Sequence, residues 1–127
     1  MESHSTFQPT HYMQNVPLTS VCETGVLLLG CSVSVPQGFL DLNDLAEVAG
    51  IVITCPSAHA FATYELVGQN VPYSSVAMIM QEETKRPIAC EVLPVTEFLE
   101  KTRLIGAASS EYPQAATEGL VLYLNRW

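Results

Sequence analysis

The chain has 127 residues, of which 48% are apolar and 14% are charged, and 13 acidic against 5 basic side chains give a formal net charge of -8. This balance is typical of one globular domain with a buried core and argues against a disordered chain. A surplus of acid repels phosphate backbones, so we expect no direct binding to nucleic acid. No secretory signal and no apolar run of ~18 residues is present. We therefore expect a cytoplasmic protein, with the nucleus as the alternative, and no membrane partner.

The four cysteines are Cys22, Cys31, Cys55 and Cys90, and none belongs to a C-x-x-C pair. Their surroundings are apolar or mixed, which favours buried, reduced thiols over a disulfide. Cys55 and His59 are four residues apart, a spacing that can point two side chains at one metal ion. A zinc site needs at least three protein ligands, so we expect no metal.

The first predicted element is a strand over residues 6–8, which ends at Pro9 because proline cannot donate to a strand ladder. Thr10 offers a hydroxyl group that caps the start of a helix across residues 11–20. Pro17 is expected to kink that helix or to end it early.

Residues 26–29 are a short apolar run between two glycines, and we expect them to be extended. Residues 38–42 form the next predicted strand and feed a helix, for which Asp41 and Asn43 are competing N-caps. Within that helix, apolar residues recur at the spacing that places them on one buried face. These residues are Leu42, Leu45, Ala46, Ala49, Val52 and Ile53.

A strand is predicted over residues 62–67 from its alternation and β-branched content, and Gly68 stops it. Ser74 then resembles an N-cap, with Tyr73 and Met78 placed as a hydrophobic staple. The side chains expected to face inward from this helix are Val76, Ile79 and Met80.

Residues 88–93 alternate again and form a predicted strand that a proline ends. Thr96 is then expected to cap a helix to about residue 104, in which Glu97 and Lys101 form an i,i+4 ion pair. Pro113 suits the first position of a last predicted helix. That helix is expected to bury Ala116, Leu120, Tyr123 and Leu124. Repeated strand-then-helix pairs predict an α/β layer architecture.

Four segments carry a family resemblance in their order and spacing: 7–15 (FQPTHYMQN), 38–49 (GFLDLNDLAEVA), 62–68 (ATYELVG) and 86–88 (RPI). Together they resemble the C-terminal half of NmrA-like proteins, which are atypical relatives of the short-chain dehydrogenases/reductases. The resemblance covers nearly the whole chain. It implies the C-terminal portion of a Rossmann-like NAD(P)-binding fold plus part of the smaller substrate or partner subdomain, so residues 1–127 are expected to be one partial NmrA-like domain.

The resemblance also implies that a parent protein binds NAD or NADP at a glycine-rich first turn. Such a turn needs glycine because only glycine lets backbone N–H groups crowd against a pyrophosphate. No G-x-G-x-x-G occurs in this sequence. We expect the turn to lie upstream of Met1, the chain to be truncated at both ends, and no coenzyme to bind to this chain alone.

By resemblance, Pro9, Thr10 and His11 follow the strand whose end approaches the nicotinamide ring, and they are the candidate cofactor contacts. The alternative is that Pro9 only ends a strand and Thr10 only caps a helix. The candidate pocket residues are Tyr12, Met13 and Phe39, for which a place in the core is the alternative.

His11 next to Tyr12 suggests acid/base chemistry, since imidazole titrates near neutral pH and a phenol can donate to a carbonyl group. The reductase chemistry of the short-chain family, however, uses a Tyr-x-x-x-Lys pair, and no tyrosine of this chain has that lysine. We therefore assign no catalytic residue.

Three functions remain open at this stage. The first is a dinucleotide-sensing regulator, linked to transcriptional regulation, that binds NAD(P) and a protein partner. The second is an NAD(P)H-dependent oxidoreductase acting on a small carbonyl or quinone substrate, and the third is a fragment with neither role. Strands that lack their Rossmann neighbours leave unpaired edges and apolar faces, so we expect the chain to associate or to be poorly soluble.

Overall fold

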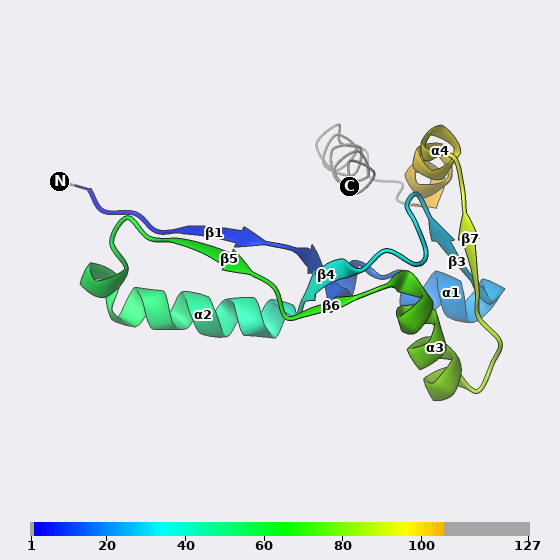
Figure 1. Cartoon of the computed structure of the whole chain (residues 1–127), viewed down its shortest axis with the longest axis horizontal. Helices are drawn as coiled ribbons and strands as arrows, with labels where there is room; N and C mark the ends of the chain where they lie inside the picture. The colour runs from blue at the N-terminus through cyan, green and yellow to red at the C-terminus, as the bar shows by residue number, and fades with distance from the viewer. Residues whose placement is uncertain (1, 106–127) are drawn as a thin grey trace. The chain divides into compact units, whose positions relative to one another are not determined.

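The computed structural model describes residues 2–105, which form two compact units (Figure 1). Unit 1 comprises residues 2–18 and Pro36–Val71, and unit 2 comprises residues 19–35 and 72–105. Each unit is built around a pair of parallel strands. None of the helices in this part of the chain has the length and apolar character that crossing a membrane requires.

Unit 1 holds two small sheets. Strand β1 (Thr6–Pro9) pairs with β5 (Thr63–Leu66) in parallel. Strand β2 (His11–Tyr12) is parallel to β4 (Gln37–Leu40), and β4 is antiparallel to β6 (Gln69–Val71). The chain therefore passes from one sheet into the other directly after β1, at Thr10.

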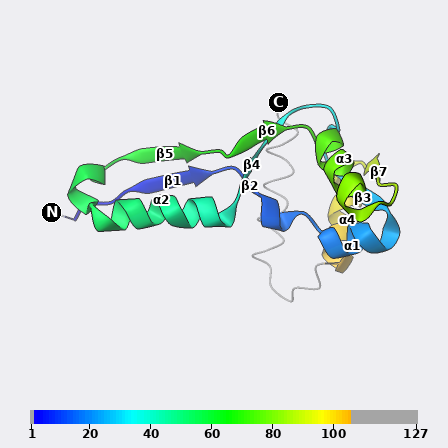
Figure 2. The ribbon, with the colours of Figure 1, turned by 90° about the horizontal axis from the view of Figure 1, so that it is seen from below.

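One long helix, α2 (Leu42–Thr54), runs alongside β1 and β5 in unit 1 (Figures 1 and 2). Its N-cap is Asp41, whose carboxylate accepts the Asn43 N–H at 2.7 Å, so Asp41 wins over Asn43 as the cap. Two short 3-10 turns, η1 (Met13–Asn15) and η2 (Pro56–His59), complete the unit.

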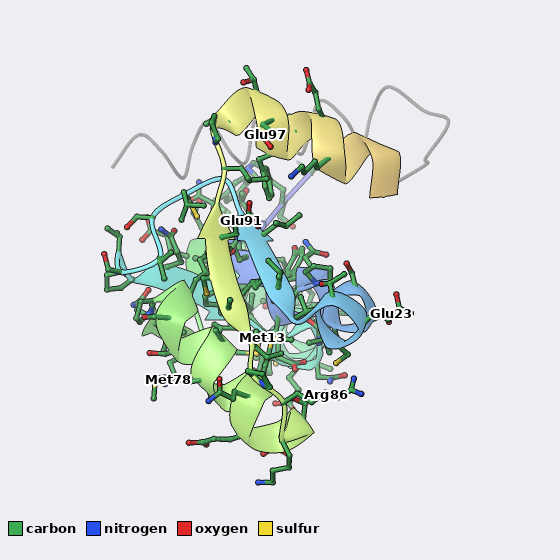
Figure 3. All side chains as sticks on the ribbon, turned by 90° about the vertical axis from the view of Figure 1, so that its right-hand side faces the viewer. Met13, Glu23, Met78, Arg86, Glu91 and Glu97 are labelled. Atoms are coloured by element: carbon green, nitrogen blue, oxygen red, sulfur yellow. The ribbon has the colours of Figure 1, made fainter. Side chains whose placement is uncertain are left out.

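Unit 2 contains a second parallel pair, β3 (Val26–Leu29) and β7 (Ala89–Val92). Its helices are α1 (Leu18–Thr24), α3 (Tyr73–Thr84) and α4 (Val95–Ile105) (Figure 3). The first residue of α1, Leu18, belongs to unit 1. Most of the deeply buried side chains of the described residues belong to this unit. They are Val21, Leu27, Leu29, Cys31, Ala77, Met80 and Leu93.

The β1–β5 pair of unit 1 is much less buried than parallel strands usually are. Paired residues of parallel strands share a face, so the register puts Thr6 with Thr63 and Gln8 with Glu65 on one side. All four of these polar side chains are exposed. One face of this pair is therefore a solvent face, and the other carries the half-buried Phe7, Tyr64 and Leu66.

The predicted strands at 6–8, 26–29, 38–42, 62–67 and 88–93 are all confirmed, with bounds that differ by at most two residues. The Glu97–Lys101 pair is also confirmed, with 3.2 Å between Oε1 and Nζ. Thr96, however, lies inside α4 rather than at its cap. The helix expected after Pro113 lies outside the described residues.

The helix predicted across residues 11–20 is wrong. Residues 11–12 form β2, one 3-10 turn follows, and α1 begins only at Leu18, after Pro17. The physical reason is that the Thr10 hydroxyl group donates to the Leu66 carbonyl oxygen of β5 instead of capping a helix. A strand partner 56 residues away thus overrides a local capping signal.

The start and the buried face of α3 also differ from the prediction. The helix begins at Tyr73 with Pro72 as its N-cap, so Ser74 lies within the first turn. Met78 was expected to be a staple residue and Ile79 an inward residue, but they are 63% and 57% exposed. Figure 3 labels Met78 on α3. The buried side chains of α3 are Ala77 and Met80.

Only half of the six side chains predicted to be buried on α2 are partly buried. Three of them, Leu45, Ala49 and Val52, are half-buried. The other three, Leu42, Ala46 and Ile53, are exposed, and no residue of α2 is fully buried.

All four cysteines are free thiols, but only Cys31 is buried, and Cys55 is exposed. Burial raises the pKa of the Cys31 and Cys90 thiols, which holds both in their unreactive protonated form.

Two glycines of unit 1 give a matched test of its packing. A Cβ at Gly68 would lie 3.0 Å from the Phe39 carbonyl oxygen, whereas a Cβ at Gly50 in α2 meets nothing within 4 Å. We expect Gly68→Ala to lower the free energy of unfolding by about 1–3 kcal/mol, because the main chain must shift. Gly50→Ala is expected to raise it by about 0.5–1 kcal/mol, because alanine is the better helix former.

Urea denaturation followed by circular dichroism measures both effects. A Gly68→Ala variant as stable as the wild type would contradict the close approach of Gly68 to the β4 backbone.

Candidate functional site

The candidate site is the edge of the β1–β5 pair at which both strands end. The register runs from Thr6 opposite Thr63 to Pro9 opposite Leu66, so the two carboxyl ends coincide. Ligands of open α/β sheets lie beyond the carboxyl ends of parallel strands. The two segments that leave this edge are the one beginning at Thr10 and the one beginning at Val67.

Thr10 links the two segments at this edge through hydrogen bonds. Its N–H donates to the Leu66 carbonyl oxygen at 3.1 Å, and its hydroxyl group donates to the same oxygen at 3.3 Å. Thr10 is nevertheless exposed. The chain is thus held in position at Thr10 while the side chain stays accessible.

Two glycines let the neighbouring strand approach this point. A Cβ at Gly38 would lie 2.9 Å from Cγ2 of Thr10, closer than side chains pack. The Gly68 N–H donates to the Phe39 carbonyl oxygen at 2.8 Å, in the close approach described above. The sequence predicts only the end of a strand at Gly68 and no separate role for Gly38. A glycine within a strand pattern is the signal for a close backbone approach.

His11 is half-buried and stacks on Phe39. The two residues are register partners in β2 and β4, and their ring centroids lie 5.8 Å apart at a tilt of 42°. Burial lowers the pKa of His11 below its usual 6.5, so the ring is neutral at pH 7. Among residues 2–105 no side chain hydrogen-bonds to its ring nitrogens, which leaves one N–H donor and one acceptor.

The three candidate pocket residues differ in how accessible their side chains are to a ligand. Met13 is 39% exposed and Tyr12 is half-buried. Phe39 is only 3% exposed and lies in the core beneath His11. Phe39 therefore contacts the His11 ring from the core and is itself hardly accessible to a ligand.

His11 and Tyr12 do not form an acid/base pair in this arrangement. They are consecutive residues of β2, opposite Phe39 and Leu40 of β4. Consecutive side chains of a strand point to opposite faces, so one substrate cannot contact both groups from the same side.

His59 lies at the other edge of the pair, where β5 begins, and it is already engaged. Its Nδ1 atom is 2.6 Å from the Tyr64 hydroxyl oxygen, and its carbonyl oxygen accepts the Ser5 hydroxyl group at 2.6 Å. Within the described part of the chain, no three His, Cys, Asp or Glu side chains are grouped to hold a metal ion. The His59 side chain is therefore engaged with Tyr64, whereas Cys55 is an exposed free thiol.

The N-terminus of α2 is unsuited to a diphosphate. Backbone N–H groups at a helix start attract phosphate, but here the Asp41 carboxylate already accepts the Asn43 N–H. A second anion at this position would meet a negative charge.

No family model matches the sequence, and a comparison with curated proteins gives no match. Solved structures do match. A triphenylmethane reductase from Citrobacter sp., complexed with NADP(H), aligns with 98% of this chain at 21% identity and a TM-score of 0.74. A nucleoside-diphosphate-sugar epimerase from Staphylococcus aureus aligns with 80% of it at 19% identity and a TM-score of 0.70.

The chain spans 44% of the reductase chain and 36% of the epimerase chain. Its fold is therefore similar to that of one part of these two chains, and the predicted α/β fold class is confirmed. The roles given to Pro9, Thr10, His11, Tyr12, Met13 and Phe39 stay predictions.

The protonation of His11 gives a test of its surroundings. Because its pKa is below 6.5 in the folded chain, the unfolded chain binds more protons between that value and about pH 6.5. Stability must therefore fall as the pH drops through this window, and His11 contributes no such loss above it. We expect His11→Gln to lose less stability than the wild type between about pH 7.5 and about pH 5.

Urea denaturation at several pH values measures this difference. An identical pH dependence in the wild type and in His11→Gln would contradict a desolvated imidazole.

Proposed function

We propose that this chain is part of an NmrA-like protein and forms the wall of an NAD(P) site that faces the nicotinamide. In this role Thr10 and His11 contact the nicotinamide and its carboxamide group, and Pro9 ends β1 so that the chain turns at that point. Tyr12 and Met13 border the space for a substrate or for a group of a protein partner.

The observation that carries this proposal is the position of Thr10 and His11 at the carboxyl ends of two parallel strands. The neutral His11 ring supports it, because a carboxamide offers both an acceptor and a donor to match its N–H and its free nitrogen. The similarity to a reductase complexed with NADP(H) supports it further. When bound, the coenzyme would supply hydride transfer, which no residue of this chain can perform.

The proposal gives the diphosphate to a glycine-rich turn that this chain does not contain. The chain's formal charge of -8 and the Asp41 cap on α2 both disfavour an added diphosphate. We therefore propose that this chain alone does not hold NAD(P) tightly and does not catalyse a reaction.

Of the functions compatible with such a site, we favour a dinucleotide-sensing regulator with a protein partner. His11 and Tyr12 lie on opposite faces of β2, and no Tyr-x-x-x-Lys pair is present, so the chain supplies a binding surface rather than a proton relay. An NAD(P)H-dependent oxidoreductase acting on a small carbonyl or quinone compound is the second candidate, and the likeness to a reductase favours it.

Binding of one half of the coenzyme tests the proposed contact. We expect millimolar nicotinamide mononucleotide to shift the backbone amide NMR signals of Thr10, His11 and Tyr12, because the ring and its carboxamide reach this edge without the diphosphate cradle. Adenosine monophosphate is the matched control, since it carries the same phosphate and sugar but no nicotinamide, and it is expected to leave these signals unchanged.

Equal shifts with both compounds would show a phosphate or sugar contact and contradict the proposal. Shifts confined to residues remote from Thr10 would contradict it as well.

Turnover separates the two candidate functions for this chain. We expect no oxidation of NADPH above the protein-free rate with a quinone acceptor, because the sequence contains no glycine-rich turn to hold the diphosphate. Protein-dependent loss of NADPH absorbance that Thr10→Val removes would contradict the regulator and favour the oxidoreductase.

A further inference from the structure

A side chain of the turn that follows β2 is bonded to the start of α2. The Leu42 N–H donates to Oε1 of Gln14 at 3.2 Å, although the two residues are 28 positions apart in the chain. Gln14 lies in η1, and Leu42 is the first residue of α2. Tyr12 and Leu40 are register partners at the ends of the parallel strands β2 and β4. The bond therefore joins the two segments that leave these strands at their common carboxyl edge.

Gln14 completes the capping of α2 from another segment of the chain. The first N–H groups of a helix have no carbonyl partner within the helix. Here the Asp41 carboxylate accepts the Asn43 N–H, and Oε1 of Gln14 accepts the Leu42 N–H. The Leu42 N–H is thus satisfied by a side chain of η1.

The turn that Gln14 holds has little else to fix it. Strand β2 has only two residues, and none of the three residues of η1 is buried. The turn closes on itself through the Val16 N–H, which donates to the Met13 carbonyl oxygen at 3.2 Å. A short exposed turn has few apolar contacts to hold it in one place. A bond from its central residue to the 13-residue helix α2 is therefore expected to determine where Tyr12 and Met13 lie.

The other half of the proposed site is held by different contacts. The Leu66 carbonyl oxygen accepts two hydrogen bonds from Thr10, and the His11 ring packs on Phe39. We call Thr10 and His11 the nicotinamide side of the site, after the ligand group proposed for them. We call Tyr12 and Met13 the substrate side.

We propose that Gln14 is the positioning residue of the substrate side, and that its bond to the start of α2 holds this side where a bound ligand contacts it. The inference rests on the proposed function, because it assigns a role within that same site. Gln14 acts through its neighbours and needs no contact with the ligand. Binding and the start of α2 are then coupled, so a ligand on the substrate side changes the surroundings of the Leu42 N–H.

Amide hydrogen exchange of the full chain measures the bond itself. Gln14→Met keeps the length of the side chain but removes the acceptor, so the Leu42 amide is expected to exchange about two- to tenfold faster, as the loss of one hydrogen bond implies. Gln14→Glu keeps an acceptor oxygen, and a helix N-terminus favours negative charge, so this variant is expected to exchange as the wild type does. Asn15→Leu removes an exposed carboxamide from the next position and is the matched control, expected to leave the Leu42 amide unchanged.

Titration with nicotinamide mononucleotide distinguishes a positioning role from a purely structural bond. In the wild type, we expect the amide NMR signals of the substrate side and of Leu42 to shift together with those of the nicotinamide side. In Gln14→Met, the nicotinamide side is expected to shift as before, because the bonds to Leu66 are intact, whereas the shifts of the substrate side and of Leu42 are lost. Gln14→Glu is expected to recover them, and Asn15→Leu is expected to keep them.

The outcomes separate this inference from the proposed function. Equal shifts of the substrate side in the wild type and in Gln14→Met, or equal exchange of the Leu42 amide in the two, would overturn the role of Gln14 alone. A wild type in which only the nicotinamide side shifts, or an equal loss from Asn15→Leu, would overturn it as well. A wild type without any shift on the nicotinamide side would contradict the proposed function and this inference with it.

Discussion

The parallel pairing of β1 with β5 is the constraint on which the rest of unit 1 depends. It aligns Pro9 with Leu66, so the two strands end together and the Leu66 carbonyl oxygen can accept both the N–H and the hydroxyl group of Thr10. That double contact fixes where the chain leaves the first sheet. It thereby fixes the start of β2 and the position of His11 over Phe39.

The side chains at the two edges of the β1–β5 pair differ in whether the fold already uses their hydrogen-bonding groups. At the carboxyl edge, Thr10 is exposed, and no side chain among residues 2–105 hydrogen-bonds to the imidazole of His11. At the amino edge, His59 is bound by Tyr64 and Ser5, so its groups are used by the fold. The two histidines thus have different surroundings, because His59 precedes β5 whereas His11 follows β1.

Local signals in the sequence predict the strands well because Pro9, Gly68 and the alternation of apolar residues act within a few positions. The same kind of reasoning fails at residues 11–20, where the partner of Thr10 is a carbonyl group in a strand far along the chain. It fails again in α3, which begins two residues earlier than predicted and buries Ala77 and Met80, whereas Met78 is exposed. Strand β6 was missed because its pairing with β4 is also a long-range contact.

At the candidate site, too, local sequence signals predict some features, whereas others depend on long-range contacts. The resemblance of residues 7–15 to NmrA-like proteins identified the segment, but the glycines that make room for it at positions 38 and 68 appear only in three dimensions. Likewise, periodicity predicted an apolar face of α2 but not that Leu42, Ala46 and Ile53 are exposed, since exposure depends on what packs against the helix.

Intermolecular nuclear Overhauser effects between nicotinamide mononucleotide and the chain test the central claim most directly. The account predicts effects from the nicotinamide ring protons to the His11 ring and to the Thr10 methyl group. Effects to the His59 or His4 rings at the amino edge, with none to His11, would contradict it.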